Sequence, residues 1–226
     1  MPGGSRWCTT RPEMIWAPTD ELWRIHDRTF CPISPNPHSK GRLALVGSHG
    51  MLYAANSLPG AVWETLLRYS VFHGRNAEFD ISRLKDQCAS RIRLRRDDIP
   101  LLELGRPGLL ALFPDGDGPE VAAVNDLLTT PAHHRTHEEA RRLFEDLRAV
   151  GIGQMPMLSW PSRQFQTSTV YLAYSPPMEE SWWEQVGDPI ALDDPELGHD
   201  LIQHELALRG FTWRPISAGA EDPLEP

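Results

Sequence analysis

Apolar residues occur along the chain in short stretches that turn residues separate. Some stretches alternate between apolar and polar positions and others are continuous and β-branched, and both patterns are typical of β-strands. They predict strands at 22–26 (LWRIH), 50–55, 79–81, 90–94 and 167–174. Three prolines within residues 31–41 exclude a helix or a central strand there, so this stretch is predicted to be a loop.

Capping residues indicate where two helices begin. Ser57 precedes an apolar stretch with a proline in its first turn, which predicts a helix that continues to Arg68. Thr136 and Glu139 have the spacing of a capping box, so a second helix is predicted to open there. Gly151 suits the end of this helix, because glycine readily adopts the left-handed conformation of a C-terminal cap.

The order of these elements favours one α+β domain. Strands and helices do not alternate strictly, which argues against a doubly wound parallel sheet. We therefore expect a single α+β domain over residues 21–175, after an extended lead-in at 1–20. Residues 176–226 contain many prolines and acidic residues, and we expect them to form a C-terminal extension with a helix at 197–209.

Charge argues against nucleic-acid binding. The chain has 226 residues, a net charge of −9 and a pI of about 5.4, whereas a nucleic-acid-binding protein usually carries a basic stripe. The nearest candidate is interpreted as the solvated edge of a strand, because two aspartates follow it; it comprises Arg91, Arg93, Arg95 and Arg96. We therefore expect no direct contact with nucleic acid.

Cysteine usage and hydropathy bear on the compartment. The cysteines at positions 8, 31 and 88 have neither metal-ligand nor redox spacing, which suits a reducing compartment. The N-terminus lacks the apolar stretch of a signal peptide. No stretch reaches the roughly 18 apolar residues that a membrane-spanning helix needs. We expect a cytoplasmic protein without membrane contact.

Common cofactor and metal motifs are missing. The chain has no glycine-rich dinucleotide motif, no P-loop, no HExxH and no GxSxG. His133, His134 and His137 cluster, but helical neighbours point to different sides and no cysteine is near. They are interpreted as a polar loop and helix start, so neither a metal nor a bound cofactor is expected.

Four charged or polar residues, far apart in sequence, are candidates for one cleft. Arg24 interrupts an apolar strand, Arg42 follows the proline-rich loop, Glu64 lies on a largely apolar helix, and Ser162 precedes the last strand. A buried charge is costly unless it is paired or binds a ligand. Arginines suit a dinucleotide diphosphate, and a carboxylate can stabilise the oxocarbenium-like transition state that forms when a nicotinamide–ribose bond breaks. The alternative is that the strand arginine and the helix glutamate pair with each other.

Three segments resemble the RES domain family, which is named for its arginine, glutamate and serine. They are LWRIH, GRLALVGSHGMLYAANSLPGAVWETLLR and SWPSRQFQTSTVYLAY, and the resemblance runs from residue 21 to 175. Its most specific part is 50–68, followed by the SRQ before the last strand. The resemblance implies an ADP-ribosyltransferase-like fold with a mixed or antiparallel β core and flanking helices.

The resemblance also implies a role for each matching position. Glu64, Arg24 and Ser162 would be catalytic, with Glu64 near the ribose and Ser162 bonded to the substrate or to Glu64. The NAD-binding set would comprise Arg24, Arg42, Tyr53, Ser162 and Arg163. Ser159 is an alternative to Ser162 as the family serine. Ser162 is not interpreted as a nucleophile, because no histidine base is placed to activate it.

Members of this family are known as toxins that degrade NAD⁺, usually encoded with an Xre-like antitoxin that blocks the cleft. The resemblance implies an enzyme that cleaves NAD⁺ at the nicotinamide–ribose bond, with water or inorganic phosphate as acceptor and an Xre-like antitoxin as protein partner. Leu43 departs from the family, which usually has an aromatic residue after the second arginine. Two alternatives therefore stay open: a mono-ADP-ribosyltransferase that modifies a protein, and a catalytically silent binding module.

Overall fold

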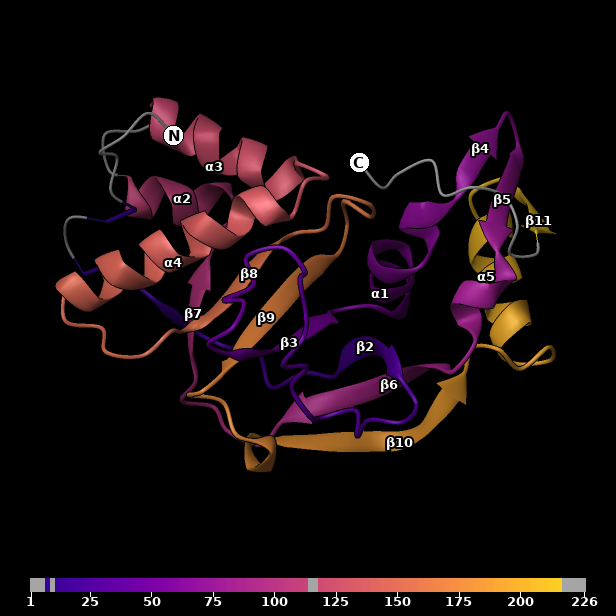
Figure 1. Ribbon diagram of the computed structural model, residues 1–226, viewed down its shortest axis with the longest axis horizontal. Helices are drawn as coiled ribbons and strands as arrows, with labels where there is room; N and C mark the ends of the chain where they lie inside the picture. The colour runs from indigo at the N-terminus through magenta and orange to yellow at the C-terminus, as the bar shows by residue number, and fades with distance from the viewer. Residues whose placement is uncertain (1–6, 9–10, 114–117, 217–226) are drawn as a thin grey trace.

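The computed structural model describes residues 7–8, 11–113 and 118–216, and these form two β-sheets with flanking helices (Figure 1). Eight strands form the main sheet in the spatial order β1-β7-β8-β9-β3-β2-β6-β10, and three form a small sheet in the order β11-β5-β4. The strands are β1 (Ile15–Trp16), β2 (Leu22–Asp27), β3 (Gly50–Ala55), β4 (Val71–His73), β5 (Asn76–Asp80), β6 (Gln87–Leu94), β7 (Pro100–Glu103), β8 (Met157–Pro161), β9 (Thr169–Ser175), β10 (Trp183–Ala191) and β11 (Thr212–Ile216).

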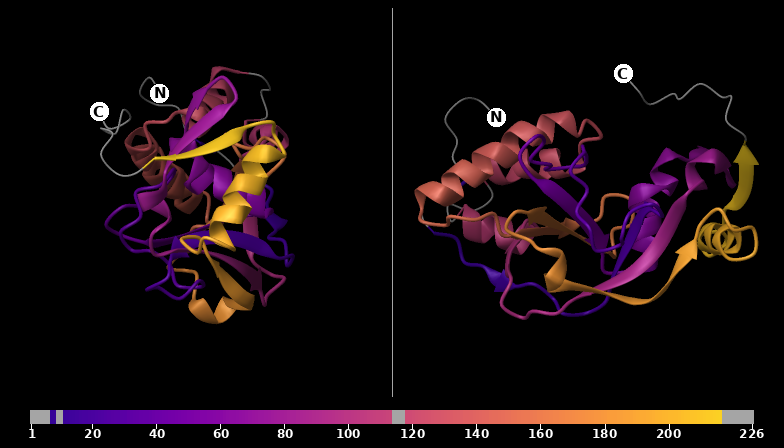
Figure 2. Two further views of the ribbon diagram at one scale, coloured as in Figure 1. Left: turned by 90° about the vertical axis from the view of Figure 1, so that its right-hand side faces the viewer. Right: turned by 60° about the horizontal axis from the view of Figure 1, so that its bottom comes forward.

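The helices lie in two groups at opposite ends of the molecule (Figures 1 and 2). Helices α2, α3 and α4 lie together beside β7, β8 and β9, whereas α5 lies with the small sheet, and α1 lies between the two groups. Their bounds are α1 (Leu58–Thr65), α2 (Arg106–Leu112), α3 (Pro119–Thr129), α4 (His134–Ala149) and α5 (Gly198–Ala207), with short 3-10 helices η1 (Leu67–Tyr69), η2 (Ile81–Leu84) and η3 (Glu180–Trp182).

Strand pairing confirms the α+β prediction. Among the described strands, β7 with β8 and β5 with β11 pair in parallel, and every other pair is antiparallel. The predicted strands at 22–26, 50–55, 90–94 and 167–174 lie on β2, β3, β6 and β9. The prediction at 79–81 runs one residue past β5, because Asp80 caps the 3-10 helix η2 by accepting from Ser82 N.

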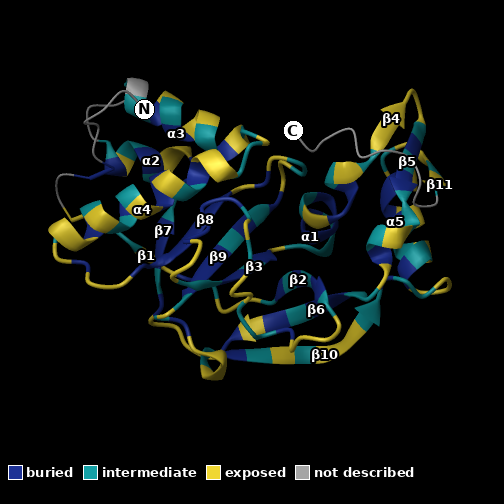
Figure 3. Cartoon of the chain, in the orientation of Figure 1, coloured by how far each residue is buried: buried dark blue, intermediate teal, exposed yellow. Residues whose placement is uncertain are grey.

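Three buried apolar clusters hold these elements together. One packs α2, α3 and α4 onto the face of β8, β9 and β3. A second joins α1 and α5 to the small sheet, and a third lies on the other face of the main sheet. Figure 3 shows the resulting stretches of buried residues along β3, β8 and β9. No helix in the described part of the chain is long and apolar enough to cross a membrane.

The first helix begins as predicted and the second does not. Ser57 Oγ accepts a hydrogen bond from Gly60 N at 3.1 Å and caps α1, which ends at Thr65 and continues as the 3-10 helix η1. Helix α4 starts at His134, so Thr136 is a helical residue and not its cap. Its hydroxyl instead donates to His133 O and accepts from the backbone of Leu43.

The interpretation of the arginine stripe as a solvated strand edge was right about solvation and wrong about the edge. Strand β10 pairs with β6 along its length, so β6 lies between β2 and β10. The sequence did not predict β10, because its middle reads Gly-Asp-Pro and this part bulges out of the ladder between Val186 and Ile190. The stripe is solvated and paired with carboxylates, namely Arg91 with Glu21, Arg93 and Arg95 with Glu184, and Arg96 with Asp98.

Residues 176–216, the described part of the predicted extension, add to both sheets. Strand β10 completes the main sheet, β11 pairs with β5, and α5 lies inside the predicted range 197–209. Ile202 and Leu206 of α5 are fully buried in the same apolar cluster as Val62 of α1. This segment therefore packs directly behind the helix that carries Glu64.

The main sheet separates in its middle. Strands β2 and β3 share one residue pair, Trp23 with Ala55, whereas each is paired along its whole length with its other neighbour. The loop at 31–41 bridges the opening. On one side, Asn36 exchanges two backbone hydrogen bonds with Met51 of β3. On the other side, the same loop accepts hydrogen bonds from Arg24 of β2. The split between the two strands leaves a concave space under the loop.

Candidate active site

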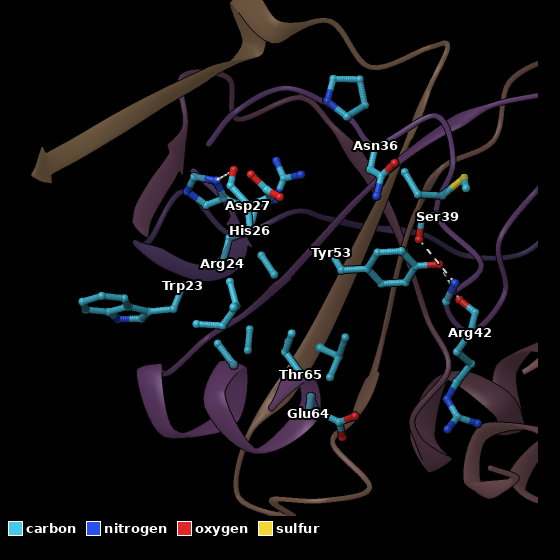
Figure 4. Close-up of a pocket in the computed structure, with 18 of the residues that line it drawn as sticks. Trp23, Arg24, His26, Asp27, Asn36, Ser39, Arg42, Tyr53, Glu64 and Thr65 are labelled. Carbon is cyan, nitrogen blue, oxygen red and sulfur yellow. Dashed lines mark hydrogen bonds between the residues drawn. The ribbon is translucent and has the colours of Figure 1, made fainter. Parts of the chain in front are cut away.

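A cavity of about 340 Å³ lies where β2 and β3 separate. Its walls come from β2, β3, the 31–41 loop and the α1–η1 segment, with His133 and Trp160 at the side of α4 and β8. Figure 4 shows Tyr53 in the middle of this space and Glu64 at the end of α1. The fold thus brings four of the sequence-predicted site residues to one cavity: Arg24, Arg42, Tyr53 and Glu64.

Arg24 reaches from β2 under the loop. Its Nη1 donates to the carbonyl oxygens of Pro32 and Ser34 at 2.6 and 2.7 Å, and only 7% of the residue is exposed. Burial lowers the pKa of Arg24 to about 10, so the group is charged at neutral pH. Its partners are neutral carbonyls and not Glu64, which means that the pairing alternative does not describe this site. Both of these hydrogen bonds of the guanidinium are made by Nη1.

Arg42 lies on the opposite side of the cavity. Its Nη1 donates to Leu127 O at 2.7 Å, and 6% of the residue is exposed. Burial lowers its pKa to about 10, and the negative charge of Glu64 opposes that shift. Like Arg24, Arg42 therefore carries a buried positive charge whose hydrogen-bond partner is a neutral carbonyl.

The residue after Arg42 belongs to the core. Leu43 is fully buried with a left-handed backbone, φ 58°, which is costly for a residue with a Cβ. Two hydrogen bonds hold that conformation, one from Leu43 N to Thr136 Oγ1 and one from Tyr174 Oη to Leu43 O, both at 2.8 Å. Leu43, where the family usually has an aromatic residue, is thus an apolar anchor that fixes the backbone position of the neighbouring Arg42.

Tyr53 of β3 packs against the same turn. Its hydroxyl donates to Arg42 O at 2.9 Å, and burial raises the pKa of the phenol. A Cβ on Gly41 would lie 2.8 Å from Tyr53 Cζ, so glycine at this position lets the ring lie flat on the backbone. Figure 4 shows the ring pointing toward Ser39 and the backbone of Arg42. Its exposed face forms part of the cavity wall.

Two donors orient Glu64 from behind. Its Oε1 accepts from Ser162 Oγ at 2.5 Å and from Gln164 N at 3.1 Å. Ser162 Oγ in turn accepts from Phe165 N at 2.8 Å. The carboxylate is therefore held by one oxygen while its residue lines the cavity, an arrangement suited to a group that must face a substrate in a fixed direction.

The remaining predicted residues lie outside the cavity wall. Ser162 is 2% exposed and contacts Glu64, so of the two roles expected for it the geometry fits the contact with Glu64. Arg163 is exposed and lies within electrostatic reach of Arg42 and His133. Ser159 lies on β8 next to Trp160, and because neighbouring strand residues point to opposite faces, Trp160 faces the cavity and Ser159 does not. Ser162, and not Ser159, is the serine at Glu64.

Sequence reasoning missed a contact across the cavity. Arg68 and His133 both line it, and Arg68 Nη2 donates to His133 Nε2 at 3.3 Å. Arg68 follows Glu64 by four residues, a spacing that often forms an ion pair on a helix. Here α1 ends at Thr65, so Arg68 is directed to His133 instead. The i+4 spacing from Glu64 was the signal that could have marked Arg68.

The cavity combines positive charge with aromatic surface. Arg24, Arg42 and Arg68 line it, and Glu64 lies among them. Trp23, Tyr53 and Trp160 contribute aromatic rings to the same wall. Guanidinium groups suit phosphate oxygens, and ring faces suit a flat heterocycle. The arrangement can bind an anionic ligand with planar rings and hold one carboxylate against it.

The other histidines near His133 point elsewhere. His137 Nε2 contacts the carbonyl oxygens of Lys40 and Gly41, whereas His134 is exposed. Within the described ranges, no three His, Cys, Asp or Glu side chains are grouped as they would be around a metal ion. The three histidines thus serve separate contacts at the start of α4.

The lowered pKa of His133 predicts a measurable loss of stability in acid. Burial and the charges of Arg68 and Arg42 lower its pKa to about 4, whereas an unfolded histidine titrates near about 6.5. Between these values the unfolded chain binds a proton that the folded chain does not. The free energy of unfolding is therefore largest above pH 6.5 and decreases as the pH falls toward 4. Because His133 is half-buried, solvent screening reduces the effect, and we expect His133→Asn to recover about 1 kcal/mol at pH 5.

Thermal unfolding at pH 7.5 and pH 5 measures this effect. His134→Asn, at the neighbouring exposed position, is the matched control and should follow the wild type. Equal acid losses in the wild type and in His133→Asn would show that His133 does not titrate in this way.

Comparisons with known proteins concern the sequence and the fold of the chain. The sequence matches the family model described as RES domain over residues 21–184. No curated protein matches it. Among solved structures, the fold is similar to one titled as the crystal structure of the M. tuberculosis MbcT–MbcA toxin–antitoxin complex, with a TM-score of 0.54 and 12% sequence identity. That similarity covers 82% of this chain and 92% of the other.

Proposed function

This chain belongs to the RES domain family, and from that premise we propose that it is an enzyme that cleaves NAD⁺ at the bond between nicotinamide and ribose. The observation that carries the proposal is a pair of buried arginines, Arg24 and Arg42, that line one cavity and donate to neutral carbonyls. Such charges are costly unless a ligand satisfies them. A diphosphate between two nucleosides would do so, and Glu64 lies at the same cavity.

In the proposed complex, each group has one task. Arg24 and Arg42 bind the diphosphate, while the rings of Tyr53 and Trp160 contact the planar parts of the dinucleotide. Glu64 faces the ribose next to nicotinamide. When the C–N bond breaks, nicotinamide leaves with the bonding electron pair and positive charge develops on the ribose. The carboxylate stabilises that charge and holds the ribose hydroxyls, and water or inorganic phosphate then attacks the same carbon.

A protein partner is part of the proposal. The structurally similar chain comes from a toxin–antitoxin complex. An enzyme that degrades NAD⁺ through an open cavity needs an inhibitor in the cell that produces the enzyme. We propose that this chain is a toxin acting in the cytoplasm, and that an antitoxin, of the Xre type by family resemblance, covers the cavity. Depletion of NAD⁺ would then stop growth when the partner is lost.

Incubation of the purified chain with NAD⁺, with and without phosphate, tests the activity. Release of nicotinamide supports the proposal, and the second product distinguishes water from phosphate as acceptor. Labelled NAD⁺ that marks a protein in place of releasing free ADP-ribose would make the chain a mono-ADP-ribosyltransferase. Binding of NAD⁺ without turnover under any of these conditions would contradict the proposal and leave a transferase that lacks its acceptor or a silent binding module.

Ser162→Ala is expected to lower kcat about 10-fold and to change KM little. A hydrogen bond to a charged group contributes about 1.5–3 kcal/mol, and about 1.4 kcal/mol corresponds to a factor of 10 in rate. The mutation removes a donor to Glu64 Oε1 and leaves the residues of the cavity wall unchanged. Steady-state nicotinamide release measures both constants.

Ser159→Ala is the matched control for that experiment. Ser159 is also buried, but it lies on the side of β8 away from the cavity. Its replacement should leave kcat near the wild-type value. A loss in Ser159→Ala that exceeds the loss in Ser162→Ala would show that the wrong serine has been assigned to Glu64.

A further inference from the structure

The C-terminal helix α5 packs against the back of the candidate active site. Its residues Ile202 and Leu206 are fully buried in the cluster that contains Trp63 and Leu66 of the Glu64 segment. Arg209 lies two residues after the end of α5, and its Nη1 donates to Glu205 O at 2.7 Å and pairs with Glu205 Oε2 at 2.8 Å. The guanidinium is therefore bonded to the backbone of Glu205 and paired with its buried carboxylate.

That guanidinium contacts both segments that position Glu64. Arg209 Cζ lies 4.5 Å from the centroid of the Phe165 ring and 5.8 Å from the centroid of the Trp63 ring. Phe165 N donates to the hydroxyl of Ser162, the residue that donates to Glu64. Trp63 is the neighbour of Glu64 on α1. Arg209 therefore reaches the carboxylate through Phe165 and Ser162 on one path, and through Trp63, the chain neighbour of Glu64, on the other.

The loop that carries Ser162 is fixed at its base by other contacts. Ser162 N donates to Ser168 O at 2.7 Å, and Ser168 Oγ donates to Asn56 Oδ1 at 2.6 Å. These bonds tie the ends of the loop to the start of α1. Phe165 at the middle of the loop is half-buried, and the Arg209 guanidinium packs on its ring. Cation–π contacts of this kind stabilise a ring against a charged partner most when both are shielded from water.

We propose that Arg209 is a positioning residue of the active site, which joins the Ser162 loop to α1 and so fixes the Glu64 carboxylate in the cavity. The inference rests on the proposed function for its kinetic consequence. It assigns a role to the segment after residue 184, which the match to the family does not include. Neither Arg209 nor Glu205 lines the cavity, so Arg209 acts through Phe165 and Trp63 and not on the substrate.

Two substitutions of Arg209 separate positioning from folding. Arg209→Met keeps an apolar stem but removes the charge, and we expect about a 10-fold lower kcat for NAD⁺ cleavage with KM within about twofold of the wild type. Arg209→Lys keeps a cation over the rings and should recover most of the rate. In the Ser162→Ala background, Arg209→Met should cause little further loss, because both changes release the same carboxylate.

Arg148→Met provides the matched control. Arg148 also packs on an aromatic ring, at 5.8 Å from the centroid of Phe144, but on α4 and away from Glu64. Its replacement should leave kcat at the wild-type value. A thermal melt of each variant shows whether a lost rate comes from lost folded protein.

Hydrogen exchange adds a readout that does not depend on activity. The amides of Gln164 and Phe165 are bonded to Glu64 and Ser162, and we expect faster exchange at both in Arg209→Met but not in Arg148→Met. Unchanged exchange in Arg209→Met would overturn the inference, as would full additivity with Ser162→Ala in an active enzyme. Faster exchange in a chain that never cleaves NAD⁺ would support the positioning role while contradicting the proposed function.

Discussion

Glu64→Gln is expected to lower kcat for NAD⁺ cleavage by about 10³-fold while the protein stays folded. The amide has nearly the shape of the carboxylate, and its oxygen still accepts from Ser162 Oγ and Gln164 N, as Glu64 Oε1 does. What the substitution removes is the negative charge at the cavity. That charge stabilises the developing oxocarbenium character of the ribose. Its loss therefore raises the free energy of the transition state and leaves ground-state binding of the diphosphate nearly intact.

Nicotinamide release under saturating NAD⁺ measures this loss, and binding of NAD⁺ to the variant measures what remains. Glu138→Gln is the control, because Glu138 is an exposed carboxylate on α4 that pairs with Arg142. It should keep the wild-type kcat. A Glu64→Gln enzyme with undiminished turnover would exclude Glu64 from the chemistry and with it the mechanism proposed for the cavity.

Arg42→Met is expected to weaken NAD⁺ binding by about 30- to 150-fold. The charge-assisted bonds that a guanidinium makes to phosphate contribute about 2–3 kcal/mol, which gives that range through RT ln K. The thermal stability of the variant, by contrast, should be unchanged or higher. Arg42 is a buried charge whose hydrogen-bond partner is the carbonyl of Leu127, and replacing a buried charge by an apolar side chain of similar length is often neutral or stabilising.

Two measurements on one sample check this pair of expectations. KM and the dissociation constant for NAD⁺ should both rise, with kcat changed far less, and Tm should be no lower than in the wild type. Arg141→Met, at an exposed position on α4, is the matched control for the loss of one positive charge. If Tm falls sharply and affinity is kept, Arg42 is a structural residue and the diphosphate must bind elsewhere.

These two predictions concern residues that the sequence marked for a physical reason. A charged residue inside an apolar strand, or next to a buried stretch, is rare unless something satisfies it, so Arg24, Arg42 and Glu64 were visible in the one-dimensional pattern. The strands around them were visible for a similar reason, because burial on a sheet face imposes a period of two. Local capping also sufficed for α1, where Ser57 bonds to a backbone three residues away.

The same reasoning failed where the deciding partner is distant in sequence. The capping box at Thr136 was plausible locally, but its hydroxyl contacts Leu43, 93 residues away. The stripe of arginines was interpreted as a solvated strand edge because two aspartates follow it. The polar and bulged sequence of β10 did not predict a strand that pairs with β6. In each case the local pattern was compatible with two structures, and a contact across the fold selected one of them.

The sequence by itself thus determined the α+β class, the positions of several strands, the resemblance to the family, and which arginines and which glutamate are candidates for one cleft. Only the tertiary structure decided that β2 and β3 separate to form a cavity, that Ser162 rather than Ser159 meets Glu64, and that Arg68 turns to His133. It also decided that the C-terminal helix supports the Glu64 segment. The physical reason is that periodicity and capping depend on neighbours along the chain, whereas these contacts join residues that are far apart in sequence, 98 positions in the case of Ser162 and Glu64. Their free energy exists only once the chain has folded.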